Sequence, residues 1–309
     1  MTQPTGYGYP MYPPAAPRPG CVPLRPLGIG DIIEGSFRAV FRNPKVMLGF
    51  AAVVSVLSAA ISAVTQLVLF ANLHLHQHPH SSNNIYRTDF SQVDGTRLLI
   101  SSLTALIGVV LSTVFGALVT GMLTLVVADD VIGRRSTLQA TWARVRPRLL
   151  PIVGITVLTS FVEVFGLLLF VVPGVWLWGI WAVAIPVFMV EQTTVSAALS
   201  RSRSLARDTF WRVWGIRSLG ALLIGALASV VTGPFTFAAF AVSHRGFSDL
   251  ASLNHPVPTS YIVITAVGAA IGATFTTPLM AAFSTLQYVD LRMRKENLTG
   301  WLRQQSGTG

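Results

Sequence analysis

Long apolar runs constrain this chain more than any other feature of its sequence. A bilayer core is crossed by a helix of about 20 mostly apolar residues. Runs of that kind lie near 46–73, 98–128, 149–171, 214–242 and 260–289, and a shorter one, 174–191, follows a break at Pro173-Gly174. Only 11% of the residues are charged, against about 25% in soluble domains. The sequence therefore predicts an all-α, polytopic membrane helix bundle of six transmembrane helices, in which the third and fourth form a tight hairpin around "VVPGVW".

The basic residues between these runs indicate the orientation of the chain. If the segments between the runs are assigned alternately to the two sides, 19 Lys and Arg residues fall on one side and 3 on the other. Loops rich in Lys and Arg stay in the cytoplasm, so both termini are expected there, in a plasma membrane of the bacterial type. The net charge of +10 is accounted for in the same way, and we expect no nucleic-acid partner.

The two ends of the chain differ from the membrane domain, which we place at residues 27–298. Residues 1–26 are rich in Pro, Gly and Tyr, lack the apolar core of a signal peptide, and are predicted to form a disordered cytoplasmic tail. That tail either recruits a protein partner or serves as a spacer. Residues 299–309 form a short cytoplasmic C-terminal tail. The single cysteine, Cys21, excludes an internal disulfide.

Three basic stretches each precede an outward-going run, at Phe37–Gly49, Thr141–Gly154 and Arg203–Gly215. Each has apolar residues at helical spacing on one face, which is typical of a short amphipathic helix lying at the membrane interface. The chain is thus predicted to repeat a unit of one interfacial helix and two spans three times. The alternative is that any basic loop before a span shows this pattern, without a structural repeat.

The first two short helices also have candidate N-terminal caps. Asp31 and Glu34 have capping-box spacing, and so do Ser136 and Gln139. Asn43-Pro44 is expected to end the first helix, because proline disfavours helix in the residue before it.

Arginines of the second and third short helices are the candidate lipid-binding residues. Guanidinium groups next to an anionic leaflet are attracted to its headgroups, by roughly 1 kcal/mol each. The predicted headgroup-binding residues are Arg134, Arg135, Arg144, Arg146, Arg201, Arg203 and Arg207. One of them, Arg201, is also spaced to pair with Glu191 when the third short helix folds back, which would be a structural contact.

Two further polar features are candidate sites. Glu163 lies within the third run, and an ionisable residue at that depth suggests function by default; the alternative is a neutral, hydrogen-bonded glutamate inside the bundle. The segment "HLHQHPH" places His74, His76, His78 and His80 at alternate positions, and imidazole is a ligand for Zn, Cu or Ni. A solvated loop explains these histidines equally, so no metal is assigned.

Small and aromatic residues of the spans give two predictions about packing. "GAAIG", Gly268 to Gly272, has the GxxxG spacing that lets two helices approach closely. The tryptophans of the fourth run, Trp176, Trp178 and Trp181, are expected to form an aromatic belt at the outer interface.

Three stretches carry a resemblance to a known family. They are "LRPLGIGDIIEGSFRAVFRNP" from Leu24, "VPGVWLWGIWAVAIPVFMVEQTTVSAALSRSRSLARDTFWRVWGI" from Val172 and "YVDLRMRKENL" from Tyr288. Over roughly residues 24–298 the chain resembles the membrane domain of glycerophosphoryl diester phosphodiesterases, which also occurs alone in bacterial integral membrane proteins of unknown function. The matching positions are Pro173, Gly174, Pro186, Glu191, Ala198, Leu199, Arg201, Ser202, Leu205, Phe210, Trp211, Gly215, Tyr288, Asp290, Leu291, Arg292 and Glu296.

This resemblance implies a membrane domain and no catalysis. The catalytic barrel that is fused to the domain in some members needs about 250 residues, and this chain has none to spare. The sequence also shows no phosphate-binding glycine loop and no nucleophilic triad. We therefore expect a non-enzymatic, lipid-contacting scaffold or modulator of membrane or envelope processes, without a cofactor. The alternative is a transporter of a lipid or small solute that uses Glu163.

Overall fold

The secondary structure described in the computed structural model is entirely helical. The structure describes residues 18–72, 95–169, 171–243 and 257–296, with the backbone alone for residues 163–169 and 171–173. The helices are α1 (Ile29–Arg42), α2 (Pro44–Asn72), α3 (Gly95–Val131), α4 (Leu138–Val145), η2 (Arg146–Arg148), α5 (Leu149–Leu169), α6 (Val171–Ile180), α7 (Ala184–Glu191), α8 (Val195–Ala206), η3 (Arg207–Thr209), α9 (Phe210–Ser243) and α11 (Thr259–Lys295). Six helical segments in these ranges are long and apolar enough to cross a membrane, which confirms the predicted fold class.

The helices follow one another as the repeat predicts. A short helix (α1, α4 or α8) is followed by a break, an outgoing long helix (α2, α5 or α9) and a returning helix. The first break is at Asn43, and α2 begins at Pro44, where proline lacks only an amide that the first turn does not use. The second return is divided into α6 and α7, whereas α3 and α11 return without interruption.

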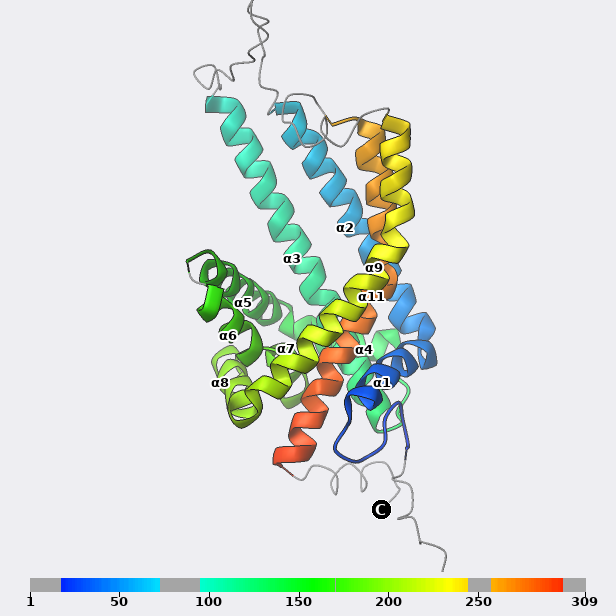
Figure 1. Ribbon diagram of the computed structural model, residues 1–309, viewed down its shortest axis with the longest axis vertical. Coiled ribbons are helices and arrows are strands. Elements are labelled where there is room, and N and C mark those ends of the chain that lie inside the picture. The colour runs from blue at the N-terminus through cyan, green and yellow to red at the C-terminus, as the bar shows by residue number, and fades with distance from the viewer. Residues whose placement is uncertain (1–17, 73–94, 170, 244–256, 297–309) are drawn as a thin grey trace, which may run out of the picture.

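The three short helices lie together at one end of the molecule (Figure 1). We call this the basic end, and we call the other end, to which α2, α3, α9 and α11 extend, the far end. Large apolar side chains remain exposed on the long helices, among them Leu106 (60%), Val230 (73%) and Phe237 (76%). Contiguous exposed apolar surface of this kind is unfavourable in water, so the long helices are suited to contact with lipid. The protein is accordingly a multi-pass membrane protein.

The second hairpin does not reach the far end. Figure 1 shows α5 and α6 beside the half of α3 that is nearer the basic end. A Cβ atom on Gly179 of α6 would lie 2.8 Å from the ring of Phe210, the first residue of α9. The guanidinium of Arg217 lies over Trp178, 4.5 Å from the ring centroid. The prediction of an outer aromatic belt on this run is therefore wrong for Trp178, because α6 lies alongside the first turns of α9.

Close packing of α9 against α11 depends on the glycines of "GAAIG". A Cβ atom on Gly268 would lie 2.6 Å from Phe235, and one on Gly272 would lie 2.8 Å from Thr232. Neither glycine has room for a side chain, so the two helices approach here as the GxxxG spacing predicts.

The chain before α1 is packed against the bundle over residues 19–28, which we call the N-terminal strap. Cys21, Val22, Leu24 and Leu27 are each 2% exposed or less. Gly20 passes so close to α3 that a Cβ atom there would lie 1.6 Å from the Asp130 carbonyl oxygen. The predicted domain boundary at residue 27 is thus too late, and the packed domain begins near residue 19. The remainder of the predicted tail, residues 1–17, lies outside the described residues, as does the C-terminal tail.

Both predicted capping boxes differ from the observed helix starts. α1 begins at Ile29, so Asp31 is at its third position and accepts the Gly28 N–H at 2.9 Å. α4 is capped by the Thr137 hydroxyl, which accepts the Ala140 N–H. Ser136 instead donates to Asp129 at 2.6 Å. The observed N-cap residue of α1, Gly28, thus precedes the predicted cap Asp31 by three residues. That of α4, Thr137, follows the predicted cap Ser136 by one residue.

Candidate functional site

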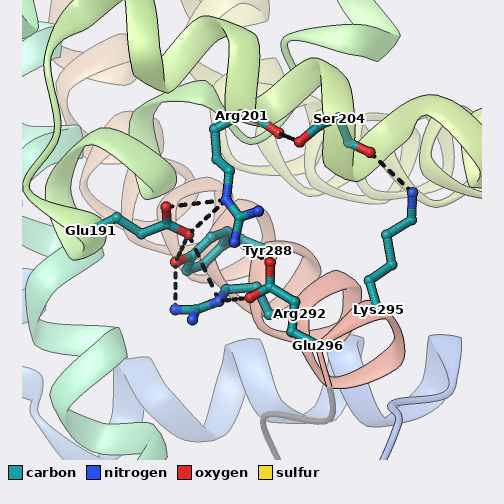
Figure 2. Close-up of polar contacts among 7 residues, drawn as sticks. All are labelled: Glu191, Arg201, Ser204, Tyr288, Arg292, Lys295 and Glu296. Atoms are coloured by element: carbon teal, nitrogen blue, oxygen red, sulfur yellow. Dashed lines mark hydrogen bonds and ion pairs between the residues drawn. The ribbon is translucent and has the colours of Figure 1, made fainter.

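A network of charged side chains joins α7, α8 and α11 at the basic end (Figure 2). We call it the Glu191 network; its members are Glu191, Arg201, Tyr288, Arg292 and Glu296. Arg201 Nε lies 3.2 Å from Glu191 Oε2, which confirms the predicted pair, and Arg201 also pairs with Glu296. Tyr288 donates to Glu191 Oε1 at 2.9 Å, while Arg292 donates to the Tyr288 hydroxyl at 3.0 Å and to Glu296 at 2.8 Å.

The network holds α8 against the ends of α7 and α11. Burial would raise the pKa of Glu296, but the hydrogen bond from Arg292 and the charges of Arg292 and Arg201 lower it below its ordinary value. Lys295 extends the same contact by donating to the Ser204 carbonyl at 3.0 Å and pairing with Asp208 at 2.9 Å. These groups neutralise one another, which is an arrangement suited to fixing a helix in place.

A second buried carboxylate, Asp290, joins α9 and α11 to the N-terminal strap. Asp290 is 1% exposed and accepts the Leu27 N–H at 2.8 Å. Arg212 and Arg294 bind the Asp290 carboxylate at 2.9 and 2.8 Å, and both also donate to the Leu27 carbonyl oxygen. The single peptide position at Leu27 is therefore bound through both its N–H and its C=O.

The end of α3 carries the third group of carboxylates. Asp130, which is 1% exposed, accepts from Arg42 at 3.2 Å and from Asn43 at 3.3 Å. Its neighbour Asp129 pairs with Arg144 of α4 at 2.8 Å. Burial, together with the adjacent Asp130 carboxylate, raises the pKa of the Cys21 thiol far above its ordinary value. Each of the returning helices α3, α7 and α11 therefore carries, near its basic end, a carboxylate that binds an arginine of another helix.

A cavity of about 750 Å³ lies between α3, α4, α7, α8 and α11 at the same end. Three arginines and three carboxylates line it, namely Arg144, Arg201, Arg292, Asp129, Glu191 and Glu296. Because these charges balance, the cavity attracts no net anion. Among the described residues no group of three His, Cys, Asp or Glu side chains is placed to hold a metal ion.

The seven arginines predicted to bind headgroups fall into two sets. Arg144 and Arg201 are used in the ion pairs given above. The other five are exposed, and none makes an ion pair with a described residue: Arg134, Arg135, Arg146, Arg203 and Arg207. The side chain of Glu163 lies outside the described residues, although its backbone belongs to α5. His74, His76, His78 and His80 lie outside them as well.

The sequence does contain a signal for the carboxylate groups that motif reasoning missed. The chain has only 12 Asp and Glu residues, and the missed carboxylates Asp129, Asp130 and Asp290 all stand, like the predicted Glu191, at the basic end of a returning helix. Acidic residues on the positively charged side of a membrane protein are candidates for internal ion pairs. The partners themselves, such as Leu27 for Asp290, are too distant in sequence to be paired by spacing.

Comparison of this chain with protein-family models, with curated proteins and with solved structures finds no match.

Proposed function

We propose that the protein is a non-enzymatic scaffold or modulator of membrane or envelope processes that binds anionic lipid headgroups at its basic end. It would lie in a plasma membrane of the bacterial type, with both termini in the cytoplasm, as the excess of Lys and Arg at that end favours. The resemblance to the stand-alone phosphodiesterase-type membrane domain supports the same proposal, since it implies no catalytic part. The five residues of the Glu191 network are all positions that carry this resemblance.

One observation carries the proposal. Arg134, Arg135, Arg146, Arg203 and Arg207 are exposed, and none of them makes an ion pair with a carboxylate in the described part of the chain. An exposed guanidinium at the interface gains roughly 1 kcal/mol from an anionic leaflet. Arg144 and Arg201 are removed from the predicted set, because their charges already hold α4 and α8 in place.

Exposed aromatic side chains accompany these arginines. Phe41 of α1 is 62% exposed, Trp142 of α4 is 39% exposed and Trp211 of α9 is 78% exposed. Aromatic rings are favoured at the depth of the headgroups, and apolar contact adds to electrostatic attraction in interfacial helices. Charge and aromatic contact at one end together fit an anionic membrane surface.

The test measures anionic lipid retained by the purified protein. The full chain is extracted in mild detergent and exchanged into nanodiscs that contain equal amounts of phosphatidylglycerol and phosphatidylcholine. A fluorescent phosphatidylglycerol then measures how far this lipid is enriched next to the protein. We expect the double variant Arg203→Gln/Arg207→Gln to lose several-fold enrichment of phosphatidylglycerol. Arg203→Lys/Arg207→Lys is the matched control, since it keeps both charges, and it should retain the enrichment. Equal enrichment in the wild type and the Gln variant would refute the proposal.

A transporter of a lipid or small solute is the second candidate function. The observation that favours it is a pair of grooves between the long helices, each of which is lined by several Ser and Thr side chains. The side chain of Glu163, which the sequence predicted for this role, lies outside the described residues.

A further inference from the structure

The second hairpin, formed by α5 and α6, is much shorter than the other two. Only residue 170 separates α5 from α6, so the tip of this hairpin lies where α6 begins, at Val171. From Val171 to Ile180 the helix rises about 14 Å, at 1.5 Å for each residue. On the same scale α9 rises about 50 Å and α3 about 54 Å.

The base of α6 is fixed at the level of the short helices. Ser202 of α8 donates to the Ile180 carbonyl oxygen at 2.7 Å. α8 in turn is bound to the last turn of α11, where Lys295 donates to the Ser204 carbonyl oxygen at 3.0 Å. The tip therefore lies within about 14 Å of Ile180, whatever the direction of α6. Half of a hydrocarbon core about 30 Å thick is about 15 Å, so the hairpin reaches no further than the middle of the membrane.

One face of α3 shows where the cover given by this hairpin ends. Near the basic end, a Cβ atom on Gly121 would lie 3.0 Å from Ile152 of α5, and Ala117, four residues earlier, is 1% exposed. Val110 and Leu103 lie seven and fourteen residues before Ala117, on the same face of the helix. They are 50% and 58% exposed, so the face is buried beside the hairpin and bare beyond it.

The sequence of the hairpin tip suits hydrocarbon rather than water. Residues 164–177, "VFGLLLFVVPGVWL", contain no charged residue and no Ser, Thr, Asn, Gln or His. The other two connections, 73–94 and 244–256, each contain Arg, Asp, Asn, Ser and His. Pro173, at the third position of α6, also lacks one of the amides that the first turn of a helix leaves unpaired, which lowers the cost of placing this turn in lipid.

We propose that the second hairpin is re-entrant: it occupies only the leaflet at the basic end, and acyl chains of the opposite leaflet cover its tip and the bare face of α3 beyond it. That face runs from Leu99, which is 66% exposed, to Val110, a rise of about 17 Å. This is close to the thickness of one leaflet of the hydrocarbon core. The protein then displaces more lipid from the leaflet at its basic end than from the other. The proposal does not depend on headgroup binding by the exposed arginines.

The experiment measures the depth of spin labels on the full chain in nanodiscs of phosphatidylglycerol and phosphatidylcholine. Cys21→Ser removes the only cysteine. Single cysteines then carry a nitroxide at the tip (Val171→Cys), in the middle of a long helix (Val56→Cys of α2, 58% exposed) and at the far end (Ser260→Cys of α11). Collisions of the label with oxygen, which dissolves in hydrocarbon, are compared with collisions with nickel ethylenediaminediacetate, which stays in water.

We expect the label at Val171 to behave like the one at Val56, with frequent oxygen collisions and with nickel collisions several-fold rarer than at Ser260. A second position, Trp176→Cys, lies about 7.5 Å nearer the base of α6. In a re-entrant hairpin the ratio of oxygen to nickel collisions rises from Trp176 to Val171, because the label moves towards the centre of the membrane. In a hairpin that crosses the membrane the ratio falls instead, because Val171 approaches the water at the far face.

A label at Leu103→Cys tests what covers the bare face of α3. Frequent oxygen collisions there support acyl chains. Rare collisions with both reagents, at Leu103 or at Val171, mean that protein covers the position, from this chain or a second copy, and overturn the choice of lipid. Nickel collisions at Val171 as frequent as those at Ser260 place the tip in water and refute the re-entrant hairpin.

Discussion

Replacing Asp290 with asparagine should release the N-terminal strap without unfolding the long helices. The Asp290 carboxylate accepts the Leu27 N–H and neutralises Arg212 and Arg294, whose guanidinium groups bind the Leu27 carbonyl oxygen. Asparagine has nearly the same shape but carries no charge. The two arginines then face an uncharged amide, and the amide oxygen cannot satisfy all three donors.

The size of the effect follows from the burial of these groups. Removing one partner of a buried ion pair costs about 3–5 kcal/mol. Asp290 is 1% exposed, but the side chains of Arg212 and Arg294 are 32% and 34% exposed, so water offsets part of the loss. We therefore expect the lower end of that range, about 3 kcal/mol, against the packing of the strap. This corresponds to a roughly 100-fold larger population of molecules with the strap released.

Cys21 makes that population measurable. It is the only cysteine of the chain, it is 2% exposed within the strap, and burial raises the pKa of its thiol so that the reactive thiolate is scarce. In the folded protein a maleimide should react with it only when the strap opens. If opening and closing are fast relative to labelling, the labelling rate is proportional to the open population. Asp290→Asn should therefore be labelled about 100-fold faster than the wild type.

Asp208→Asn is the matched control, because Asp208 also pairs with a basic residue of α11, Lys295 at 2.9 Å, but its side chain is 78% exposed. We expect its labelling rate to stay close to that of the wild type. The labelling rate of each variant in SDS gives the intrinsic reactivity of its thiol, and the rate for the folded protein is divided by it. If Asp290→Asn and Asp208→Asn are labelled at the same rate, Asp290 does not hold the strap, and the account of this group as a structural tie is wrong.

Two further predictions concern the same end of the molecule. Gly20→Ala should also speed labelling of the strap cysteine, because the new Cβ would lie 1.6 Å from the Asp130 carbonyl oxygen, whereas Gly30→Ala, which meets nothing within 4 Å, should not. Glu296 has a lowered pKa in the folded protein, so the stability it contributes is present above its unfolded pKa of about 4.5 and is lost as pH falls through the folded value. Thermal unfolding of the wild type should therefore converge on that of Glu296→Gln at acidic pH and exceed it at neutral pH.

Hydropathy and proline placement predicted the long helices well. The run expected at 46–73 is the helix Pro44–Asn72, and the run expected at 260–289 lies within Thr259–Lys295. These limits are set locally, because an apolar run must begin and end where charged or helix-breaking residues occur. The direction of a helix is not local. The run at 174–191 has the length of a span, yet α6 lies against Phe210 at the start of α9, and hydropathy contains no term for that packing.

The candidate site was predicted only where its partners are close in sequence. Glu191 and Arg201 are ten residues apart, and their pairing follows from the return of α8 alone. The contact of Leu27 with Asp290 joins positions 263 residues apart, and no helical spacing relates them. The two grooves are likewise assembled from three or more helices, so no spacing within a single helix predicts them.

The arginines of the short helices serve two purposes, which a count of basic residues does not separate. In each short helix one arginine turns inward to a carboxylate: Arg42 of α1 binds Asp130, Arg144 of α4 binds Asp129, and Arg201 of α8 binds Glu191. A buried carboxylate that lost its arginine would be an uncompensated charge, so these pairs fix where each short helix lies. Once the helices are fixed, the remaining arginines can only face outward, towards solvent or headgroups. The positive charge available to a membrane is therefore smaller than the sequence suggests, and its position is set by the carboxylates at the ends of the returning helices.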